Sequence, residues 1–463
     1  MQGGGRPYRR HRPDAMLMQA RILITIAVGA IGSLATSFLH AAAPEVASAS
    51  AATDRPTVYL AGQEGPRPGG APEGPAGEAP PDPWCLLWRD GLFLASPHDQ
   101  FTLKVGGRMQ VDFGWPAGGE QLERELKDTF DDKVEFRSLR VYLSGQFVKN
   151  VEYKGEVSFV NQLFTVTDLF IRLTDLPAVG NLTIGHFKEP RSLEQLTSSN
   201  NITFLERALP AVFSSRRSFG LMAGNQALDG RMTWAAGVFH TSNDPVWGLT
   251  DTGNSWDVTG RVTGLAWYED DGKRLLHLGA SYGLRIPGGP VRFQQRPEAF
   301  FMPRFTDTKE IDADSVHRLG VEAAWVDGPL SVQGEYLAAA CGAPSASNPW
   351  LHGAYAQASY LLTGETRPYD RASGTFAGVR PRKNLCENGG GGAWEVAARC
   401  SFVGLNQGEL PASARAVQDF TFGLNWYLNL NVRVMWNYIH SWVAGTGVDG
   451  GVDTFAMRFQ IAF

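Results

Sequence analysis

The chain has 463 residues, and 43% of them are hydrophobic, which is too many for a disordered protein. Its 53 glycines and its 11% of aromatic residues favour many strands and turns. The formal net charge of −5 gives a nucleic-acid-binding protein no overall support. The four cysteines form no CxxC pair, which argues against a zinc site, whereas a disulfide between Cys386 and Cys400 is left open.

The N-terminus has the order of segments that is typical of an export signal. Basic residues precede an apolar run from Ile22 to Leu39, and an Ala-rich segment follows that run. The run is long enough to be weighed as a membrane helix, but no run of this length recurs downstream. We therefore predict an export signal and cleavage region over residues 1–49, with cleavage near Ala43 or a few residues later. Any further membrane contact must be made without helices.

A segment rich in proline and glycine follows the signal. Residues 50–87 include QEGPRPGGAPEGPAGEAPPDP, which cannot pack a core, and we predict a linker there. The remaining residues, 88–463, are predicted to form a single domain.

From Phe101 onward the hydrophobic pattern has a period of two, which is typical of β-strands. In FTLKVGGRMQVDF, for example, Leu103 and Val105 face one way, whereas Lys104 and Arg108 face the other. Sixteen such segments are predicted, near 101–113, 136–148, 151–161, 167–176, 180–187, 217–224, 231–239, 256–268, 275–285, 316–326, 329–338, 351–363, 393–403, 419–429, 430–442 and 453–463.

Two arrangements account for this alternation. A soluble β-protein would turn its apolar side chains inward, and this many strands would require a large sandwich or propeller. A transmembrane barrel turns them outward to lipid and encloses polar residues around water. The export signal, the even strand number, segments near the ~9–11 residues that a tilted spanning strand needs and aromatic residues at strand ends favour the second arrangement. The fold class predicted is all-β, a 16-stranded antiparallel transmembrane β-barrel.

The last segment, DTFAMRFQIAF, fits this arrangement. Phe455, Phe459 and Phe463 share the lipid-facing parity, and pairing of this strand with the first would leave no open edge. The terminal aromatic residue resembles the C-terminal signal of bacterial outer-membrane proteins. Short and long connections tend to alternate along the chain, as in such barrels. Residues 364–392 depart from this expectation, because a long connection falls where a short periplasmic turn is expected.

Several stretches resemble the phosphate-selective porins of the O/P type. They are WRDGLFLASPHDQFTLKVGGRMQVDF, FRSLRVYLSGQFVKNVEYKGEVSF, IGHFKEP, ASYLLTGETRPYDRASGTFAGVRP, GAWEVAARCSFVGLNQGEL and FTFGLNWYLNLNVRVMWNYIH, which together extend over residues 88 to 463. The resemblance implies an outer-membrane porin that assembles as a homotrimer, contacts outer-membrane lipid and has no cofactor. It also implies a long loop folded into the lumen, where arginines and lysines guide small anions, phosphate in this family, by passive diffusion.

The candidate for that loop is KEPRSLEQLTSSNNITFLERALPAVFSSRR, residues 188–217, which carries five basic and three acidic side chains. Guanidinium groups suit phosphate because their forked donors match its oxygens and keep their charge at neutral pH. Further basic residues lie on the lumen parity of the strands, together with acids such as Glu156 and Asp257. The predicted anion-pathway residues are Arg108, Arg140, Lys154, Arg172, Lys188, Arg191, Arg207, Arg216 and Arg217. The alternative for each arginine is an ion pair that only lines a wet wall.

Other motifs predict no enzyme. GTGVDG (445–450) matches a dinucleotide-binding pattern, but a strand follows it where a helix is required. The nine histidines form no HExxH motif, and no metal site or nucleic-acid partner is predicted. Two other functions remain open: a general or weakly selective porin, and a structural outer-membrane barrel without selective transport.

Overall fold

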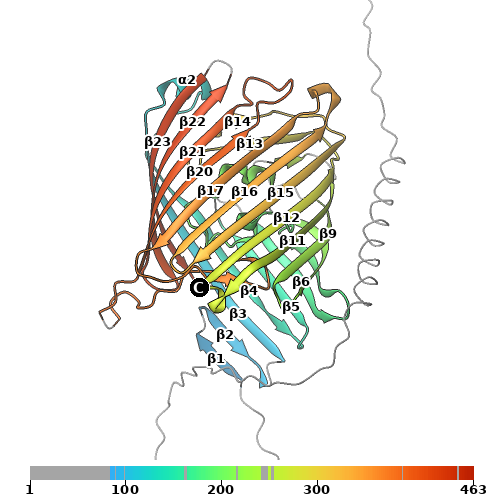
Figure 1. The fold of residues 1–463 in the computed structure, drawn as a ribbon, viewed down its shortest axis with the longest axis vertical. Helices are drawn as coiled ribbons and strands as arrows, with labels where there is room; N and C mark the ends of the chain where they lie inside the picture. Colours follow the sequence, from blue (N-terminus) through green and yellow to red (C-terminus); the bar gives the residue numbers. More distant parts are fainter. Residues whose placement is uncertain are drawn as a thin grey trace, which may run out of the picture.

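The computed structural model describes residues 84–88, 90–97, 100–160, 164–214, 217–240, 249–251, 255–387, 389–445 and 448–463. The predicted export signal and nearly all of the predicted linker lie outside these ranges. Sixteen antiparallel strands within them form a closed barrel (Figure 1). These strands are β3 (Phe101–Ala117), β4 (Lys133–Phe147), β5 (Val151–Ser158), β6 (Thr165–Leu176), β7 (Gly180–Phe187), β8 (Ser218–Ala227), β9 (Met232–His240), β11 (Trp256–Glu269), β12 (Arg274–Ile286), β15 (Ser315–Asp327), β16 (Leu330–Gly342), β17 (Trp350–Leu361), β20 (Ala393–Gly404), β21 (Ala416–Tyr427), β22 (Val432–Gly445) and β23 (Val448–Ala462).

The smaller elements lie in the connections and before the first barrel strand. Strands β1 (Cys85–Trp88) and β2 (Leu92–Ala95) form a hairpin that pairs with the start of β3. The others are α2 (Glu120–Leu126), α3 (Leu193–Leu196), η2 (Leu209–Phe213), β10 (Leu249–Asp251), η3 (Asp270–Gly272), β13 (Val291–Gln295), β14 (Thr306–Asp307), η4 (Pro344–Ala346), β18 (Tyr369–Asp370) and β19 (Thr375–Phe376). No helix in the described ranges is long and apolar enough to cross a membrane.

The barrel closes between its last and first strands. Strand β23 pairs antiparallel with β3 from Asp453 opposite Ala117 to Ala462 opposite Arg108. Phe463 continues the ladder, because its backbone exchanges hydrogen bonds of 2.8 and 2.9 Å with Gly107. Closure satisfies backbone groups that an open edge would expose to hydrocarbon, where each unpaired group costs several kcal/mol.

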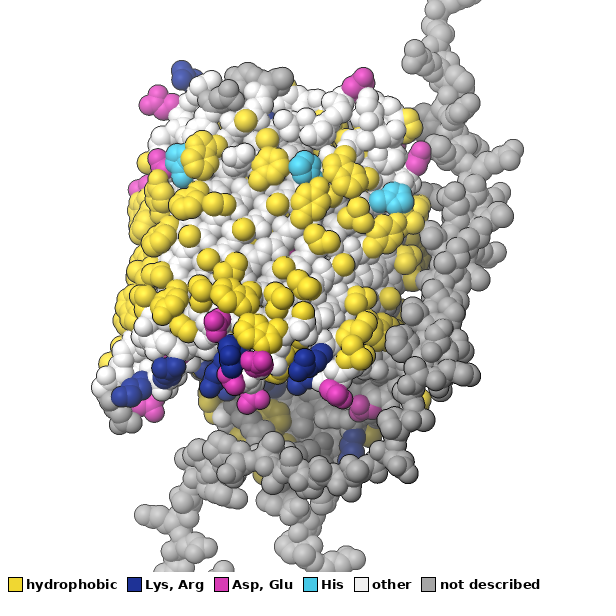
Figure 2. Space-filling view, viewed as in Figure 1, with side chains coloured by type: hydrophobic (Ala, Val, Ile, Leu, Met, Phe, Trp, Pro, Cys, Tyr) yellow, Lys and Arg dark blue, Asp and Glu magenta, His cyan; other side chains and the backbone are white. Residues whose placement is uncertain are grey.

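The side chains have the inverted arrangement that the sequence predicts. On β15 the outward-facing Leu319 and Val321 are 40% and 55% exposed, whereas the inward-facing Arg318 and Glu322 are buried. Figure 2 shows apolar side chains spread over the barrel wall, with many of the charged ones at its lower rim. The prediction of a 16-stranded antiparallel transmembrane β-barrel is confirmed, and each predicted segment overlaps one barrel strand. Of the GTGVDG motif, Gly445 ends β22 and Val448 begins β23, and the two residues between them lie outside the described ranges.

Three connections fold into the lumen. The first is residues 188–217, called the inserted loop below, and the second is residues 287–314. The third is residues 362–392, called the long turn, which comes from the end of the barrel that carries the short turns. Its length is an enlargement of one turn and not a miscounted strand, since β17 and β20 pair directly.

The four cysteines are all described, and Cys341, Cys386 and Cys400 are free thiols. The disulfide left open between Cys386 and Cys400 is therefore absent. Cys386 lies in the long turn, whereas Cys400 is exposed on β20 between the buried, inward-facing Arg399 and Ser401.

Candidate functional site

The inserted loop occupies the side of the lumen that faces the later strands. Its 3₁₀ helix η2 packs against β16, β17, β20 and β21, and it buries Leu209 and Phe213 completely. These apolar residues join a core with Phe293 and Phe305 of the connection 287–314. This part of the lumen is therefore filled, and a large cavity remains along β3 to β9.

Buried polar contacts anchor the loop to the wall. The carboxylate of Glu335 on β16 accepts hydrogen bonds from the backbone N–H groups of Leu193 and Glu194, at 3.0 and 2.8 Å. The Glu194 carboxylate lies 3.1 Å from the Arg399 guanidinium and accepts a 2.9 Å hydrogen bond from the Ala208 backbone. Such buried contacts fix the position of the inserted loop in the lumen.

Glu206 forms a second anchor. It pairs with Arg137 on β4, and its distance to Arg458 on β23 is 2.9 Å. Arg458 also pairs with Asp112 on β3 at 2.6 Å. Burial favours the neutral acid, but Arg137 and Arg458 overcome this effect and hold the pKa of Glu206 at about 2. The Glu206 carboxylate is therefore ionised at neutral pH. It holds the inserted loop to β4 and β23, the two strands that flank β3 where the barrel closes.

A cavity of about 530 Å³ lies between the inserted loop and β3 to β9. The described residues that line it include nine basic side chains and three acidic ones. The basic ones are Arg108, Arg137, Arg140, Lys154, Arg172, Lys188, Arg207, Arg217 and Arg261, and the acidic ones are Glu156, Asp168 and Asp370. Acids behind this lining, among them Glu206 and Glu322, pair with some of these arginines and reduce the excess of positive charge without cancelling it.

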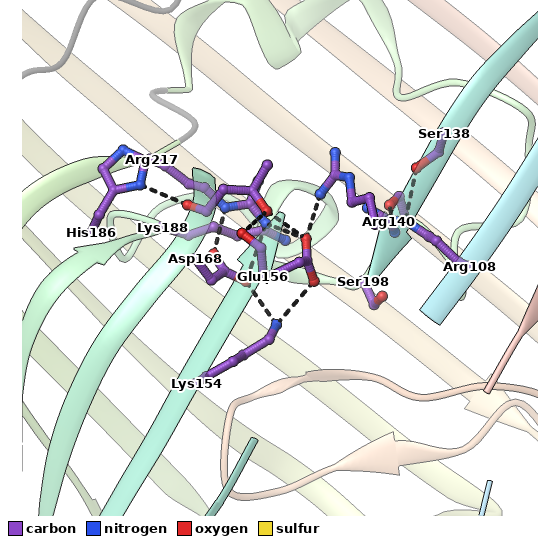
Figure 3. A network of polar contacts seen from close by, with 12 residues as sticks. Arg108, Ser138, Arg140, Lys154, Glu156, Asp168, His186, Lys188, Ser198 and Arg217 are labelled. Atoms are coloured by element: carbon purple, nitrogen blue, oxygen red, sulfur yellow. Dashed lines mark hydrogen bonds and ion pairs between the residues drawn. The ribbon is translucent and has the colours of Figure 1, made fainter. Parts of the chain in front are cut away.

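Two carboxylates at the cavity wall organise three of the basic residues (Figure 3). Glu156 on β5 lies 2.7 Å from Arg140, and Asp168 on β6 lies 2.7 Å from Lys154. Lys154 also reaches Glu156 at 3.3 Å, and Arg217 pairs with Asp168. These ion pairs hold the basic side chains in fixed positions beside the cavity.

Three other basic residues at the cavity contact neutral oxygens. The Arg108 guanidinium donates to Ser138 at 2.9 Å and to Asn200 at 3.0 Å. Lys188 and Arg207 donate to backbone carbonyl oxygens of the inserted loop, at distances from 2.7 to 3.4 Å. Among the described residues, no carboxylate lies within 4.0 Å of any of the three.

Burial affects the two loop cations. Burial, reinforced by Arg207 and Arg217, lowers the pKa of Lys188 well below its ordinary value. Burial also lowers the pKa of Arg207 to about 10. Arg207 therefore keeps its charge at neutral pH, whereas Lys188 releases its proton at a lower pH than an exposed lysine would.

Two further cavities continue from the first. One of about 330 Å³ shares Arg108, Arg140 and Lys154 with it and adds Lys104 and Tyr142. Another of about 470 Å³ shares Lys104 and Tyr142 with the second and reaches the short-turn end of the barrel at Phe463. The three cavities follow one side of the lumen, and basic residues line each of them.

Seven of the nine predicted pathway residues line the 530 Å³ cavity, namely Arg108, Arg140, Lys154, Arg172, Lys188, Arg207 and Arg217. Arg191 does not line it and is instead fully buried among β11, β12 and β15. Arg216 lies outside the described residues.

The sequence analysis missed Arg137 because a β-bulge changes the parity of β4. The pairing shifts beside Gln110, so that Arg137 and Ser138 both face the lumen. A strict period of two places one residue of such a pair on the wrong face. Asp168 also lines the cavity, and it was missed although it shares the lumen parity of Arg172.

The arginines on later strands serve a different part of the structure. Arg285, Arg399 and Arg458 are at most 1% exposed and pair with carboxylates at 2.7, 3.1 and 2.6 Å, respectively. The ion pairs of Arg399 and Arg458 with Glu194 and Glu206 hold the inserted loop against the wall, whereas Arg285 pairs with Asp257 on the neighbouring strand. No group of three or more His, Cys, Asp or Glu side chains in the described ranges could hold a metal ion.

The fold and this basic lining agree with comparisons to known proteins. A family model described as phosphate-selective porin O and P matches residues 103–463. Porin O of Pseudomonas aeruginosa is 25% identical over 415 residues, which are 81% of this chain and 91% of that protein. An uncharacterized protein of Caulobacter vibrioides is 28% identical over 339 residues, 70% of this chain, and the match spans 65% of that protein's length.

A solved structure has the same fold. The anion-selective porin from Comamonas acidovorans superimposes with a TM-score of 0.50 at 12% identity, over 78% of this chain and 100% of that chain. At this identity the likeness concerns the barrel fold alone. Because the family match extends over nearly the whole barrel, the chain belongs to the phosphate-selective porin O and P family and is an outer-membrane porin.

Proposed function

We propose that this porin passes small anions, phosphate among them, by passive diffusion along the basic side of its lumen. The excess of nine basic over three acidic side chains around the 530 Å³ cavity carries this proposal. Positive groups on a low-dielectric wall raise the local concentration of anions and exclude cations. The path would run past Lys188, Arg207 and Arg217 to Arg108, and from there to Lys104 at the short-turn end.

The way these cations are held suits transport rather than retention. Conduction requires several sites that bind an anion weakly enough for it to leave. Arg140, Lys154 and Arg217 share Glu156 and Asp168, so an anion must compete with these carboxylates. Arg108 faces no such competitor within 4.0 Å among the described residues, and we propose it as the strongest site.

We also propose that the porin assembles as a homotrimer through the side that carries β5 and β7. These two strands have only 8 residues each, whereas β15 has 13 and β23 has 15. A tilted strand needs ~9–11 residues to span the hydrocarbon of a bilayer. The low wall at β5 and β7 is therefore better suited to burial between subunits than to contact with lipid. Cross-linking followed by mass determination in mild detergent would give three subunits if this is right.

The division of the chain belongs to the same proposal. Export to the outer membrane requires a signal, which we assign to residues 1–49, and we assign residues 50–87 to a linker that precedes the barrel. Mass spectrometry of the mature protein tests the cleavage site: loss of about the first 43 residues supports the assignment.

Phosphate competition in planar bilayers tests the solute. Chloride current through single channels is measured while phosphate is added at constant ionic strength. A fall in chloride current that levels off with phosphate concentration supports phosphate binding in the path. An open channel that phosphate leaves unchanged would indicate a general porin, and absence of conductance would indicate a structural barrel.

A further inference from the structure

Four histidines lie toward the same end of the barrel wall, on four different strands. His240 ends β9, His317 and His352 are the third residues of β15 and β17, and His440 lies in the second half of β22. This end is opposite Phe463 and is called the outer end below, because the short turns of such barrels are periplasmic. Figure 2 shows histidine side chains within a band of large apolar side chains near the upper end of the wall.

All four imidazoles face away from the lumen. His317 is exposed and shares the parity of Leu319, whereas the neighbouring Arg318 is buried inside. His240, His352 and His440 are half-buried on the outer face of their strands. These side chains therefore belong to the membrane-facing wall and not to the transport path.

An aromatic ring lies beside each imidazole. The ring centroids are 5.2 Å apart for His240 and Trp256 and 4.1 Å apart for His440 and Trp442. His317 and His352 have similar neighbours at 6.2 and 5.6 Å, which are Tyr282 and Phe402. Belts of tryptophan and tyrosine mark the level of the lipid headgroups in membrane proteins. The four imidazoles therefore lie where headgroups meet the barrel.

These strands have no other basic group on their outer face. All residues of β9, β15, β17 and β22 are described, and they include only two arginines and no lysine. Both arginines, Arg318 and Arg433, are buried on the inner face. Imidazole is the side chain that gains a positive charge between about pH 8 and pH 5. Histidine is therefore the source of positive charge at this level of the four strands.

The groups that face the imidazoles from neighbouring strands are uncharged, with one exception. The residues paired with the four histidines across the ladders are Phe219, Trp256, Leu284, Ala340, Ala338, Gly404, Phe420 and Asp453. The Asp453 carboxylate lies 2.5 Å from His440 Nδ1 and also accepts a 2.6 Å hydrogen bond from Tyr438. Two further tyrosines, Tyr282 and Tyr336, lie beside His317 and His352.

The contacts of His317 and His440 leave one ring nitrogen for a ligand. The Tyr282 hydroxyl lies 2.8 Å from His317 Nδ1, and Asp453 contacts Nδ1 of His440. Nε2 of either ring has no hydrogen-bond partner among the described residues. A protonated ring nitrogen forms a short, charge-assisted hydrogen bond with a phosphate oxygen. Because Asp453 competes for His440, the other three imidazoles are the better sites.

We infer that His240, His317, His352 and His440 bind the phosphate groups of lipids in the outer leaflet, and that protonation of the imidazoles strengthens this binding. The acyl chains of a bound lipid lie along the apolar wall below the aromatic belt. These contacts fix the depth of the barrel in the membrane. The inference does not rest on the proposed function, since the four side chains face away from the lumen.

Native mass spectrometry of the full barrel in detergent tests this inference. The probe is phosphatidylglycerol, because its phosphodiester keeps a constant charge in the range where imidazole titrates. The wild type should retain more of this lipid at about pH 6 than at about pH 8. The variant with His240→Tyr, His317→Tyr, His352→Tyr and His440→Tyr keeps an amphipathic ring at each position. Its affinity at the lower pH should fall roughly two- to fivefold, and its pH dependence should disappear.

Three controls separate imidazole binding from other contacts. The Lys and Arg side chains at the lower rim keep their charge over this pH range and contribute equally to both proteins (Figure 2). Leu319→Tyr adds a ring to the outer face of β15 without removing an imidazole, and it should behave as the wild type. Phosphatidylcholine, which has no net charge, should be retained less than phosphatidylglycerol by the wild type at the lower pH.

Two results would overturn the inference. One is the same pH dependence in the wild type and the fourfold variant, which would mean that the histidines serve only as belt residues. The other is equal retention of the two lipids by the wild type at the lower pH. The double variant His317→Tyr/His352→Tyr serves the same comparison if the fourfold variant does not fold, and an unchanged pH dependence there would also contradict the inference.

Discussion

Arg108 combines three properties that a selectivity residue needs. It lies on a barrel strand, its guanidinium borders both the 530 Å³ and the 330 Å³ cavity, and its hydrogen-bond partners among the described residues are neutral oxygens of Ser138, Ser199 and Asn200. The positive charge of an ion-paired neighbour such as Arg140 is partly neutralised by its carboxylate partner. We therefore expect charge removal at Arg108 to affect permeation more than charge removal at Arg140.

Arg108→Gln tests this expectation. A unit charge ~4 Å from a passing anion contributes up to about 4 kcal/mol at an effective dielectric constant of 20, and screening reduces this to about 1 kcal/mol. The ratio of anion to cation permeability should fall roughly fivefold, as measured from reversal potentials. Arg274→Gln is the matched control, because Arg274 lies at a turn and pairs with Asp270 there. An unchanged ratio in Arg108→Gln would contradict the role given to Arg108.

Lys188 makes the selectivity depend on pH. Its pKa is lowered by burial and by Arg207 and Arg217, so its charge is lost at a lower pH than that of an exposed lysine. Anion selectivity should therefore decline with rising pH before ordinary lysines titrate. Reversal potentials at several pH values should show this decline in the wild type and not in Lys188→Gln. The same decline in both proteins would mean that another group titrates.

Residue-level predictions from the sequence were right where the strand pattern is regular. Arg108, Lys154 and Arg172 face the lumen as the period of two indicates. Arg137 could not be found in this way, because a bulge reverses the parity and leaves no mark in the sequence. Arg191 does not line the cavity for another reason: the loop composition indicates charge but not which side of the loop faces the cavity.

At the scale of elements, the inserted loop and the long turn divide the lumen. The inserted loop fills the side near β16 to β21, and the long turn enters from the opposite end of the barrel. In the long turn, Tyr369 lies 2.7 Å from His277 on β12, and the carbonyl of Gly374 accepts a 2.8 Å hydrogen bond from Arg261 on β11. Phe376 packs with Leu193 of the inserted loop, so the two insertions meet inside the barrel.

Shortening the long turn should widen the path. Asp370, Ala372, Ser373 and Thr375 line the 530 Å³ cavity. Removal of residues 369–376 is geometrically permitted, because the Ala377 N–H and the Pro368 carbonyl are already 2.9 Å apart. Single-channel conductance should rise while the barrel remains folded.

A substitution at the far end of the same turn provides the control. No heavy atom lies within 4 Å of a Cβ added to Gly391, so Gly391→Ser should leave conductance unchanged. Equal conductance in the shortened variant and the wild type would show that the long turn does not restrict the path.

The sequence indicated these insertions incompletely. The family resemblance implied an inserted loop with residues 188–217 as its candidate, and the position of these residues in the lumen agrees with that. Residues 364–392 were recognised only as too long for a turn. The contacts that fold them inward, such as Arg261 with Gly374, join residues more than 100 positions apart, and no local pattern reports such pairs.

At the scale of the whole molecule, stability depends on the inverted arrangement of apolar and polar faces. Val321 lies at the middle of β15 on the outer face and is 55% exposed. Arginine at the bilayer midplane of a barrel costs about 2–4 kcal/mol, so Val321→Arg should lower the free energy of unfolding in lipid by that amount. Val321→Ile should change it by less than about 0.5 kcal/mol. Urea unfolding in phospholipid vesicles measures both, and equal stabilities would contradict a lipid-facing β15.

The net charge of the cavity lining and the net charge of the whole chain have opposite signs. The full chain carries a formal net charge of −5, yet the cavity lining is basic. Selectivity in a barrel depends on which charges face the lumen and not on their total. The position of the charges, rather than the composition, therefore carries the prediction of anion transport.

The zero-current potential of the wild-type protein in a planar bilayer tests that prediction most directly. With a potassium chloride gradient across the bilayer, we expect a potential whose sign indicates preferential passage of chloride, and we expect its magnitude to fall in Arg108→Gln. A potential near zero, or one of the opposite sign, would contradict selection of anions by the basic cavity.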